Sequence, residues 1–147
     1  MTLLVGDYVP STARWVRDQV EEYEASGGAR ANTLRGGKDP IVVITSVGRK
    51  SGALRKNPLM RVERGGKYLA VASIGGGPTN PEWYHNFLAN PVVELQDGPE
   101  PKLYRARLLD GAEREDWWAY AVQTWPTYGR YQQKTERQIP IFLLEET

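Results

Sequence analysis

A basic stretch between residues 47 and 67 is the first feature of this sequence that could do chemistry. It contains seven basic side chains and one acid, Glu63, although the net charge of the whole chain is only +1. The seven are Arg49, Lys50, Arg55, Lys56, Arg61, Arg64 and Lys67. Ser51 and Gly52 follow the first two cations, and such a loop offers backbone N–H groups and positive charge to a phosphate or carboxylate. The stretch therefore predicts an anion site, but a solvated basic hairpin would have the same composition.

A glycine-rich segment, residues 73–77 (SIGGG), is a second candidate for binding an anion. Its glycines allow a ligand to approach the backbone closely, and the helix expected after Asn80 and Pro81 adds partial positive charge at its N-terminus. The spacing is not that of a dinucleotide-binding loop. Alone, this pattern is typical of any flexible loop.

Three aromatic residues near the C-terminus, Trp125, Tyr128 and Tyr131, are spaced by three. One helical turn would align them along one face, where they could hold a flat conjugated substrate. Core packing would produce the same spacing. Both interpretations remain open from the residues alone.

Several chemistries are excluded by residue types. The chain has no cysteine and one histidine, His85, so disulfides, thiolate metal sites and multi-histidine metal sites are excluded. His85 has no identifiable serine or acid partner, so it does not suggest a hydrolytic site. An enzyme of this composition would take its reactivity from a cofactor.

The elements that must position these residues fit one domain, residues 1–147, with a helix and connection over 1–40 and a barrel with helices over 41–147. Helices are predicted over 11–26 (capped by Ser11), 82–89 (capped by Asn80, with Pro81 at its first position) and 112–125. Strands are predicted over 41–45, 59–64, 68–73, 92–96, 102–108 and 139–144. Six short strands with three or four helices predict an α+β class and a small, mostly antiparallel barrel. No apolar run is long enough to span a bilayer and no signal peptide is evident, so we expect a cytoplasmic protein.

The sequence resembles the deazaflavin-dependent nitroreductase family of actinobacteria in three groups of segments. They are 44–52 (ITSVGRKSG) with 55–59 (RKNPL), 72–76 (ASIGG) with 80–91 (NPEWYHNFLANP), and Tyr128 and Tyr131 with 137–140 (RQIP). These landmarks follow the family's order over about residues 15–145.

The resemblance implies a split β-barrel that binds reduced coenzyme F420, a deazaflavin with a phosphate and an oligoglutamate tail, and passes its hydride to a quinone, a nitroaromatic or another electron-poor conjugated acceptor. It implies cofactor contacts from Thr45, Arg49, Lys50, Ser51, Gly52, Arg55, Lys56, Asn57, Pro58, Ser73, Ile74, Gly75, Gly76, Trp83, Tyr84 and Asn86. It implies a substrate border of Trp15, Met60, Trp125, Tyr128 and Tyr131. Ser73 or Tyr128 would donate a hydrogen bond to the acceptor, and no metal is expected.

This chain departs from the family pattern at three positions. Ile74 stands where the best-known member has lysine, and Met60 and Trp125 replace two of its tyrosines, so we expect a more apolar and differently shaped pocket. Whether this pocket reduces nitroimidazoles stays open. Alternatives are a deazaflavin carrier with little turnover and a split barrel that uses FMN or haem. The expected partner is a small electron acceptor and not a nucleic acid. Membrane contact through the 11–26 helix and the oligomeric state stay open.

Overall fold

The computed structural model describes residues 3–147, which form seven strands, four α-helices and two short 3-10 helices. The helices are α1 (Arg14–Ala25), η1 (Leu34–Gly36), η2 (Ile74–Gly76), α2 (Glu82–Ala89), α3 (Gly111–Thr124) and α4 (Thr127–Gln133). The strands are β1 (Ile41–Val47), β2 (Leu54–Met60), β3 (Glu63–Arg64), β4 (Lys67–Val71), β5 (Val92–Gln96), β6 (Pro101–Leu108) and β7 (Ile141–Glu146).

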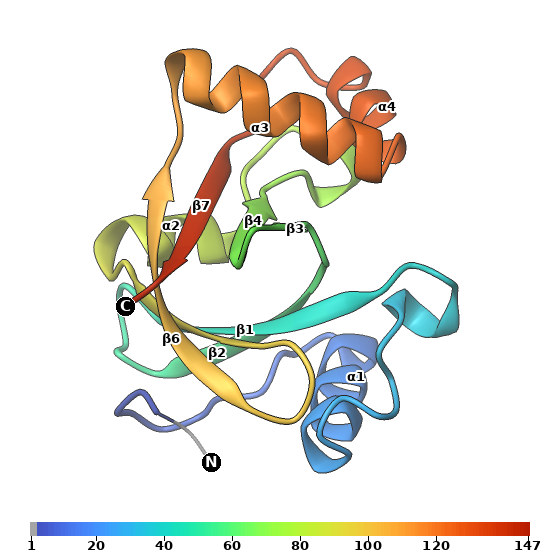
Figure 1. The fold of residues 1–147 in the computed structure, drawn as a ribbon. Helices are drawn as coiled ribbons and strands as arrows, with labels where there is room; N and C mark the ends of the chain where they lie inside the picture. Colours follow the sequence, from blue (N-terminus) through green and yellow to red (C-terminus); the bar gives the residue numbers. More distant parts are fainter. Residues whose placement is uncertain (1–2) are drawn as a thin grey trace.

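All seven strands belong to one antiparallel sheet, in the order β2-β1-β5-β6-β7-β4-β3. The sheet curls into a half-barrel, with α3 and α4 beside the β4–β7 end and α1 beside the β1–β2 end (Figure 1). This is the split-barrel fold expected from the resemblance. The α+β class is confirmed, with seven strands in place of about six.

Strand β1 is buried on both faces. Its successive side chains point to opposite sides of the sheet, and each side is covered by a different core. Val42 and Ile44 pack inside the half-barrel with Trp83 and other core residues. Ile41 and Val43 pack against Val20 and Tyr23 of α1. The continuous apolar run that predicted this strand is thus explained by cover on both sides.

The β4–β7 end of the sheet has the same two-sided burial. Val71, Ile141 and Leu143 face a second core with Trp117 of α3 and Tyr128 of α4, whereas Phe142 faces the half-barrel interior. The helix predicted over 112–125 is confirmed as α3, one residue earlier at each end. Tyr128 and Tyr131 lie on α4, a separate helix that begins only after Trp125, so the three aromatics do not share one helical turn.

Strand β2 was missed by the sequence prediction, which placed a strand over 59–64 instead. Leu54–Met60 pairs with β1 along its whole length, from Val47↔Leu54 to Ile41↔Met60. Pro58 and three polar residues obscured its β pattern, and they are tolerated because β2 is at the edge of the sheet. The chain then leaves the strand at Arg61, and only Glu63–Arg64 returns as β3.

Both predicted helix caps are wrong in detail. Helix α1 begins at Arg14 with Ala13 at the N-cap, and Ser11 instead accepts a hydrogen bond from the Ala13 N–H. Helix α2 has the predicted span, but Pro81 itself is the N-cap. The Asn80 side chain accepts a hydrogen bond from Arg137 and caps nothing.

Candidate cofactor and acceptor site

A polar pocket of about 480 Å³ lies between the β1–β2 turn, strand β2 and the start of α2. It is lined by Gly48, Arg49, Lys50, Ser51, Arg55, Asn57, Pro81, Glu82, Trp83 and Asn86. We call it the polar pocket. The turn that carries its cations is fixed to α2, because the Arg49 N–H donates to Oδ1 of Asn86 at 3.0 Å.

The cations of the polar pocket are mostly uncompensated. Arg49 lies 3.9 Å from the exposed carboxylate of Glu82, and neither Lys50 nor Arg55 has a carboxylate within 4.0 Å among residues 3–147. Positive charge that is free of internal partners can bind phosphate or carboxylate groups of a ligand. The polar pocket therefore suits a polyanion.

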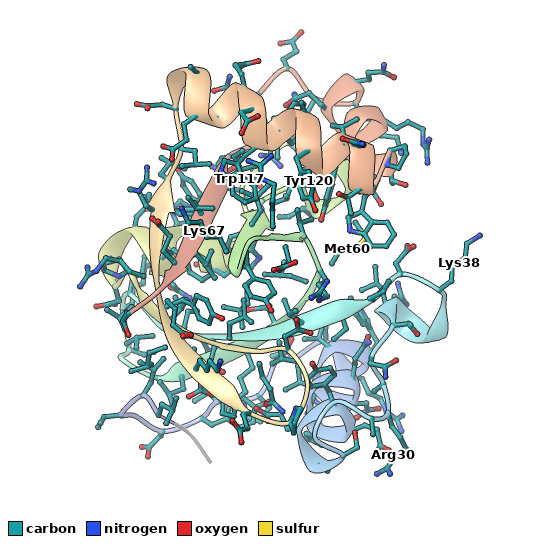
Figure 2. The ribbon with its side chains drawn as sticks, viewed as in Figure 1. Arg30, Lys38, Met60, Lys67, Trp117 and Tyr120 are labelled. Atoms are coloured by element: carbon teal, nitrogen blue, oxygen red, sulfur yellow. The ribbon has the colours of Figure 1, made fainter. Side chains whose placement is uncertain are left out.

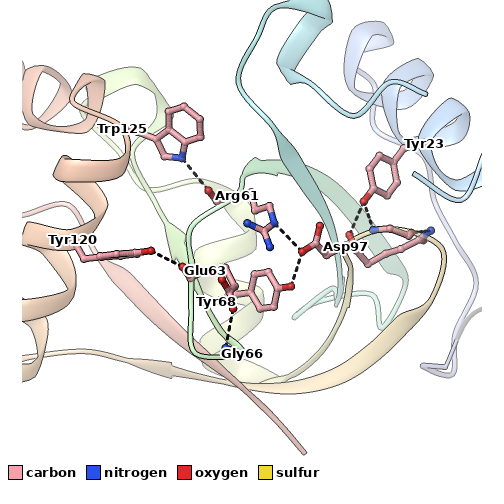
Figure 3. A network of polar contacts seen from close by, with 10 residues as sticks. Tyr23, Arg61, Glu63, Gly66, Tyr68, Asp97, Tyr120 and Trp125 are labelled. Atoms are coloured by element: carbon pink, nitrogen blue, oxygen red, sulfur yellow. Dashed lines mark hydrogen bonds and ion pairs between the residues drawn. The ribbon is translucent and has the colours of Figure 1, made fainter. Parts of the chain in front are cut away.

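The other cations of the basic stretch do not contribute to this pocket. Arg61 pairs with Asp97 at 2.8 Å, Arg64 with Asp116 at 2.7 Å and Lys67 with Glu145 at 3.4 Å. Figure 3 shows the first pair within a network in which Tyr68 also donates to Asp97. Lys56 is buried beside Glu24 of α1, on the face of β2 away from the pocket. The predicted cluster is thus divided among several places in the fold.

A second, mainly apolar pocket of about 250 Å³ opens next to the first. It is lined by Trp15, Leu34, Pro58, Leu59, Met60, Val71, Ser73, Ile74, Gly75, Pro81, Trp83, Tyr128 and Tyr131. We call it the apolar pocket. Figure 2 shows Met60 in the space between α3 above and β1 below.

Pro81 and Trp83 line both pockets, so the polar and apolar pockets adjoin at the start of α2. Trp83 is buried against Phe87 and Phe142 in the half-barrel core, which fixes the shared wall. An elongated ligand with an anionic part and a flat conjugated part would fit this arrangement.

The loop Ser73–Gly77 forms one wall of the apolar pocket. Ile74 has φ 43° and Gly75 has φ 59°, both in the left-handed region. For a β-branched residue this conformation is strained, and the Ile74 side chain stays 52% exposed. Gly76 packs so closely on α4 that a Cβ there would lie 2.6 Å from the Tyr131 carbonyl oxygen.

Tyr128 and Ser73 are two of the three hydroxyl-bearing residues that line the apolar pocket, with Tyr131 as the third, and they are the two that are buried. Tyr128 is buried, and this burial raises the pKa of its hydroxyl well above the ordinary value. A tyrosine hydroxyl is protonated at neutral pH even at its ordinary pKa, and burial moves the pKa of Tyr128 further from neutrality, so this hydroxyl can donate a hydrogen bond. Ser73 is also buried where it borders the pocket.

Most predicted site residues line one of the two pockets, and six do not. Thr45 is buried within β1, and Tyr84 packs against Phe142. Trp125 donates its indole N–H to the Arg61 carbonyl at 2.9 Å (Figure 3). Lys56, Gly52 and Gly76 also lie outside both linings. These six residues therefore lie outside both pocket linings, and their contact with a ligand stays a prediction.

Six lining residues were not among the predicted site residues: Gly48, Pro81, Glu82, Leu34, Leu59 and Val71. Gly48, Pro81 and Glu82 lie within or beside predicted motifs and could have been found by extending them. Leu34 carries no such signal, because it lies in the glycine-rich connection after α1 and reaches the pocket only through folding.

No group of three or more His, Asp or Glu side chains in the described part of the chain could hold a metal ion. The residues that line the two pockets suit an organic anion with a flat ring. They combine cations without strong internal partners, an apolar wall and a neutral hydroxyl. A deazaflavin with a phosphate and an oligoglutamate tail has the matching parts. The residues present therefore fit this cofactor.

Comparison with known proteins gives the family. The model of the F420H(2)-dependent quinone reductase family matches residues 15–146. The F420H(2)-dependent quinone reductase Rv1261c of Mycobacterium tuberculosis is 33% identical over 111 residues, 74% of each chain.

Two solved structures are similar as well. The structure of an F420-H2 dependent reductase (FDR-A) is 53% identical, with a TM-score of 0.68 over 72% of this chain and 94% of that one. A structure described as a domain-swapped dimer is 47% identical, with a TM-score of 0.72 over 92% of this chain and 100% of that one. On the family match, which spans nearly its whole length, this chain belongs to the F420H(2)-dependent quinone reductase family.

Proposed function

We propose that this chain binds F420H2 across the two adjoining pockets and transfers its hydride to a quinone held in the apolar pocket. The observation that carries the proposal is the shared border at Pro81 and Trp83, which joins a cationic pocket to an apolar one. Family membership supports the same reaction. When bound, F420H2 supplies the hydride, and the protein supplies binding, orientation and a neutral hydrogen-bond donor.

Each pocket has a distinct task in this proposal. Arg49, Lys50 and Arg55 bind the phosphate and glutamate carboxylates, since they lack strong internal partners. The Ser73–Gly77 loop and Trp83 border the conjugated ring where the polar pocket gives way to the apolar one. Met60, Tyr131 and Trp15 border the acceptor on the other side.

The Tyr128 hydroxyl is the group we assign to the acceptor oxygen. A quinone gains negative charge on oxygen as it accepts a hydride, and a fixed neutral donor stabilises that charge. The Tyr128 hydroxyl is protonated at neutral pH and can donate, and burial raises its pKa further. Ser73 lies in the lining of the same pocket and is the second candidate donor.

The acceptor would enter beside α1, where Trp15 is partly exposed at the edge of the apolar pocket. No helix among residues 3–147 has the length and apolar character needed to cross a bilayer. Our proposal places the enzyme in the cytoplasm, with the acceptor reaching it from solution or from the inner membrane surface. The outer face of α1 carries Arg14, Arg17, Asp18 and Glu21, and this mixture of charges would bind an anionic surface only weakly.

The proposal is tested by titrating the protein with F420 and with FMN while following tryptophan fluorescence, and then by following oxidation of F420H2 with and without a quinone. We expect saturable quenching by F420, weaker quenching by FMN, and oxidation that depends on the quinone. Tight F420 binding without quinone-dependent oxidation would indicate a carrier. Preference for FMN would contradict the cofactor assignment.

A further inference from the structure

The Arg137 side chain makes four hydrogen bonds to the Ser73–Gly77 loop and its flanking residues. Its Nε donates to the Gly77 carbonyl at 2.9 Å, and Nη1 donates to Oδ1 of Asn80 at 2.8 Å. Its Nη2 donates to the carbonyls of Ala72 and Ser73 at 3.1 and 2.9 Å. One guanidinium thus holds both ends of the Ser73–Gly77 loop and the residue before the N-cap of α2.

These contacts are all to neutral oxygens. Among residues 3–147 no carboxylate lies within 4.0 Å of Arg137, so the guanidinium is used as a rigid five-donor fork and not as half of an ion pair. Arg137 lines neither pocket and would not touch a ligand. Any effect on the reaction must act through the loop.

The segment that carries Arg137 is itself attached to α4. The Gln132 side chain donates from Nε2 to the Arg137 carbonyl at 2.7 Å and accepts from the Ile139 N–H at 3.0 Å. Helix α4 also presents Tyr128 and Tyr131 to the apolar pocket. A continuous set of hydrogen bonds therefore connects α4, through Gln132 and Arg137, to the loop with Ser73, Ile74 and Gly75.

The loop needs such a connection because its backbone is strained. Ile74 adopts φ 43°, which an L-residue with a branched Cβ keeps only when its surroundings enforce it. The Arg137 guanidinium ties down the carbonyls before and after this residue, and Gly76 seats the loop on Tyr131. Arg137 thus donates three hydrogen bonds to backbone carbonyls at the two ends of this loop.

We propose that Arg137 is a positioning residue that fixes the Ser73–Gly77 loop relative to α4, and so sets the spacing between the two walls of the apolar pocket where F420H2 and the acceptor meet. The inference rests on the proposed function. Small errors in such spacing are costly, since hydride transfer requires the two reacting carbons to be held in contact. Loss of Arg137 should therefore affect ligand binding and turnover more than it affects folding.

The test compares R137M and R137K with R114M. Arg114 is a suitable control because it also donates to a backbone carbonyl, that of Ile139 at 2.6 Å, but it does so from α3 and lies outside both pockets. Arg114 is buried and Arg137 is half-buried, so loss of Arg114 should cost at least as much stability. Each protein is assayed for amide hydrogen exchange in peptides that cover residues 72–80, for the Kd of F420 by tryptophan fluorescence, for kcat with a quinone, and for the unfolding midpoint.

We expect R137M to exchange faster over residues 72–80, to bind F420 about tenfold more weakly and to lose about tenfold in kcat, whereas R114M loses stability with both ligand parameters within about twofold of wild type. R137K keeps the charge but not the fork, so it should lose at least about fivefold in affinity. Because R137K is the milder change, it serves if R137M does not fold.

Wild-type exchange in the loop and wild-type F420 affinity in R137K would refute the proposed role of Arg137 and leave the proposed function intact. A wild-type protein that does not bind F420 would refute the proposed function, and with it the role of this loop in hydride transfer. The two failures are therefore distinguishable.

Discussion

Arg55 and Lys56 are neighbours in β2, but their side chains lie on opposite faces of the sheet. Arg55 lines the polar pocket, whereas Lys56 is buried beside Glu24 of α1 and near the ring of Tyr8. This follows from the alternation of side chains along a strand. Two adjacent cations of one sequence motif therefore lie in different environments, Arg55 at an open pocket and Lys56 in a buried ion pair.

The first prediction separates these two tasks. R55A should weaken F420 binding by about tenfold with little change in stability, because it removes a charge from an open pocket. K56M should lower the free energy of unfolding by about 2 kcal/mol, because it leaves Glu24 partly buried without its partner. Titration with F420 and urea denaturation measure the two effects. Equal effects of both variants on F420 affinity would contradict the assignment.

The second prediction concerns salt. Because Arg49, Lys50 and Arg55 would bind an anionic tail in an open pocket, F420 affinity should fall by about tenfold between about 0.05 and about 0.5 M NaCl. A deazaflavin that lacks the phosphate and glutamates should bind more weakly and show almost no dependence on salt. Titrations at several salt concentrations test this, and K50A should reduce the slope for F420. An equal dependence of affinity on salt for the two ligands would show that the anionic tail does not bind in the polar pocket.

The fold and most residues that line the two pockets could be predicted from the sequence, because local signals and global packing agree there. The strand over 92–96 and the helix over 82–89 have the predicted bounds, since turn residues and proline mark their ends. The resemblance gave the family correctly. Pocket-lining residues within the segments that carry the resemblance, such as Asn57 and Asn86, could be predicted without knowledge of tertiary contacts.

Other features could not be predicted because tertiary contacts decide them. The Lys56 side chain points to α1 only because Leu54–Met60 pairs with β1 in one register, and a basic composition does not reveal that register. Leu34 reaches the apolar pocket from a connection with no periodicity. Trp125 matched the family's substrate border, but its indole is used to bind the Arg61 carbonyl.

The third prediction compares the two tryptophans that were expected at the substrate border. W15A should raise the KM for the quinone by about fivefold, because Trp15 lines the apolar pocket and is partly exposed at its edge. W125F should leave this KM within about twofold of wild type and instead cost about 1 kcal/mol of stability through the lost hydrogen bond to Arg61. Steady-state kinetics and thermal unfolding decide. A larger change in KM for W125F than for W15A would reverse the assignment.

The fourth prediction concerns Tyr128 and pH. Y128F should lower kcat by about tenfold and leave the Kd of F420 nearly unchanged, because it removes only the hydroxyl proposed to donate to the acceptor.

Burial raises the pKa of Tyr128 in the folded state, so its contribution to stability is complete below pH about 10 and is lost as the pH rises towards the folded-state pKa. Wild type should therefore lose more stability than Y128F between about pH 10 and pH 11. A kcat for Y128F equal to that of wild type would exclude Tyr128 as the donor and leave Ser73.

The fifth prediction concerns the backbone of Ile74. At φ 43° a glycine is relaxed and an isoleucine is not, so I74G should lose the strain of the folded state while increasing the freedom of the unfolded chain. These effects oppose each other, and the unfolding midpoint should change little or rise. I74V keeps the branched Cβ and the strain, which makes it the matched control.

Because the Ile74 side chain borders the apolar pocket, I74G should also raise the KM for a quinone by about threefold, whereas I74V should change it by less than about twofold. An unfolding midpoint of I74G well below that of I74V would show that side-chain packing, and not backbone strain, governs stability at this position.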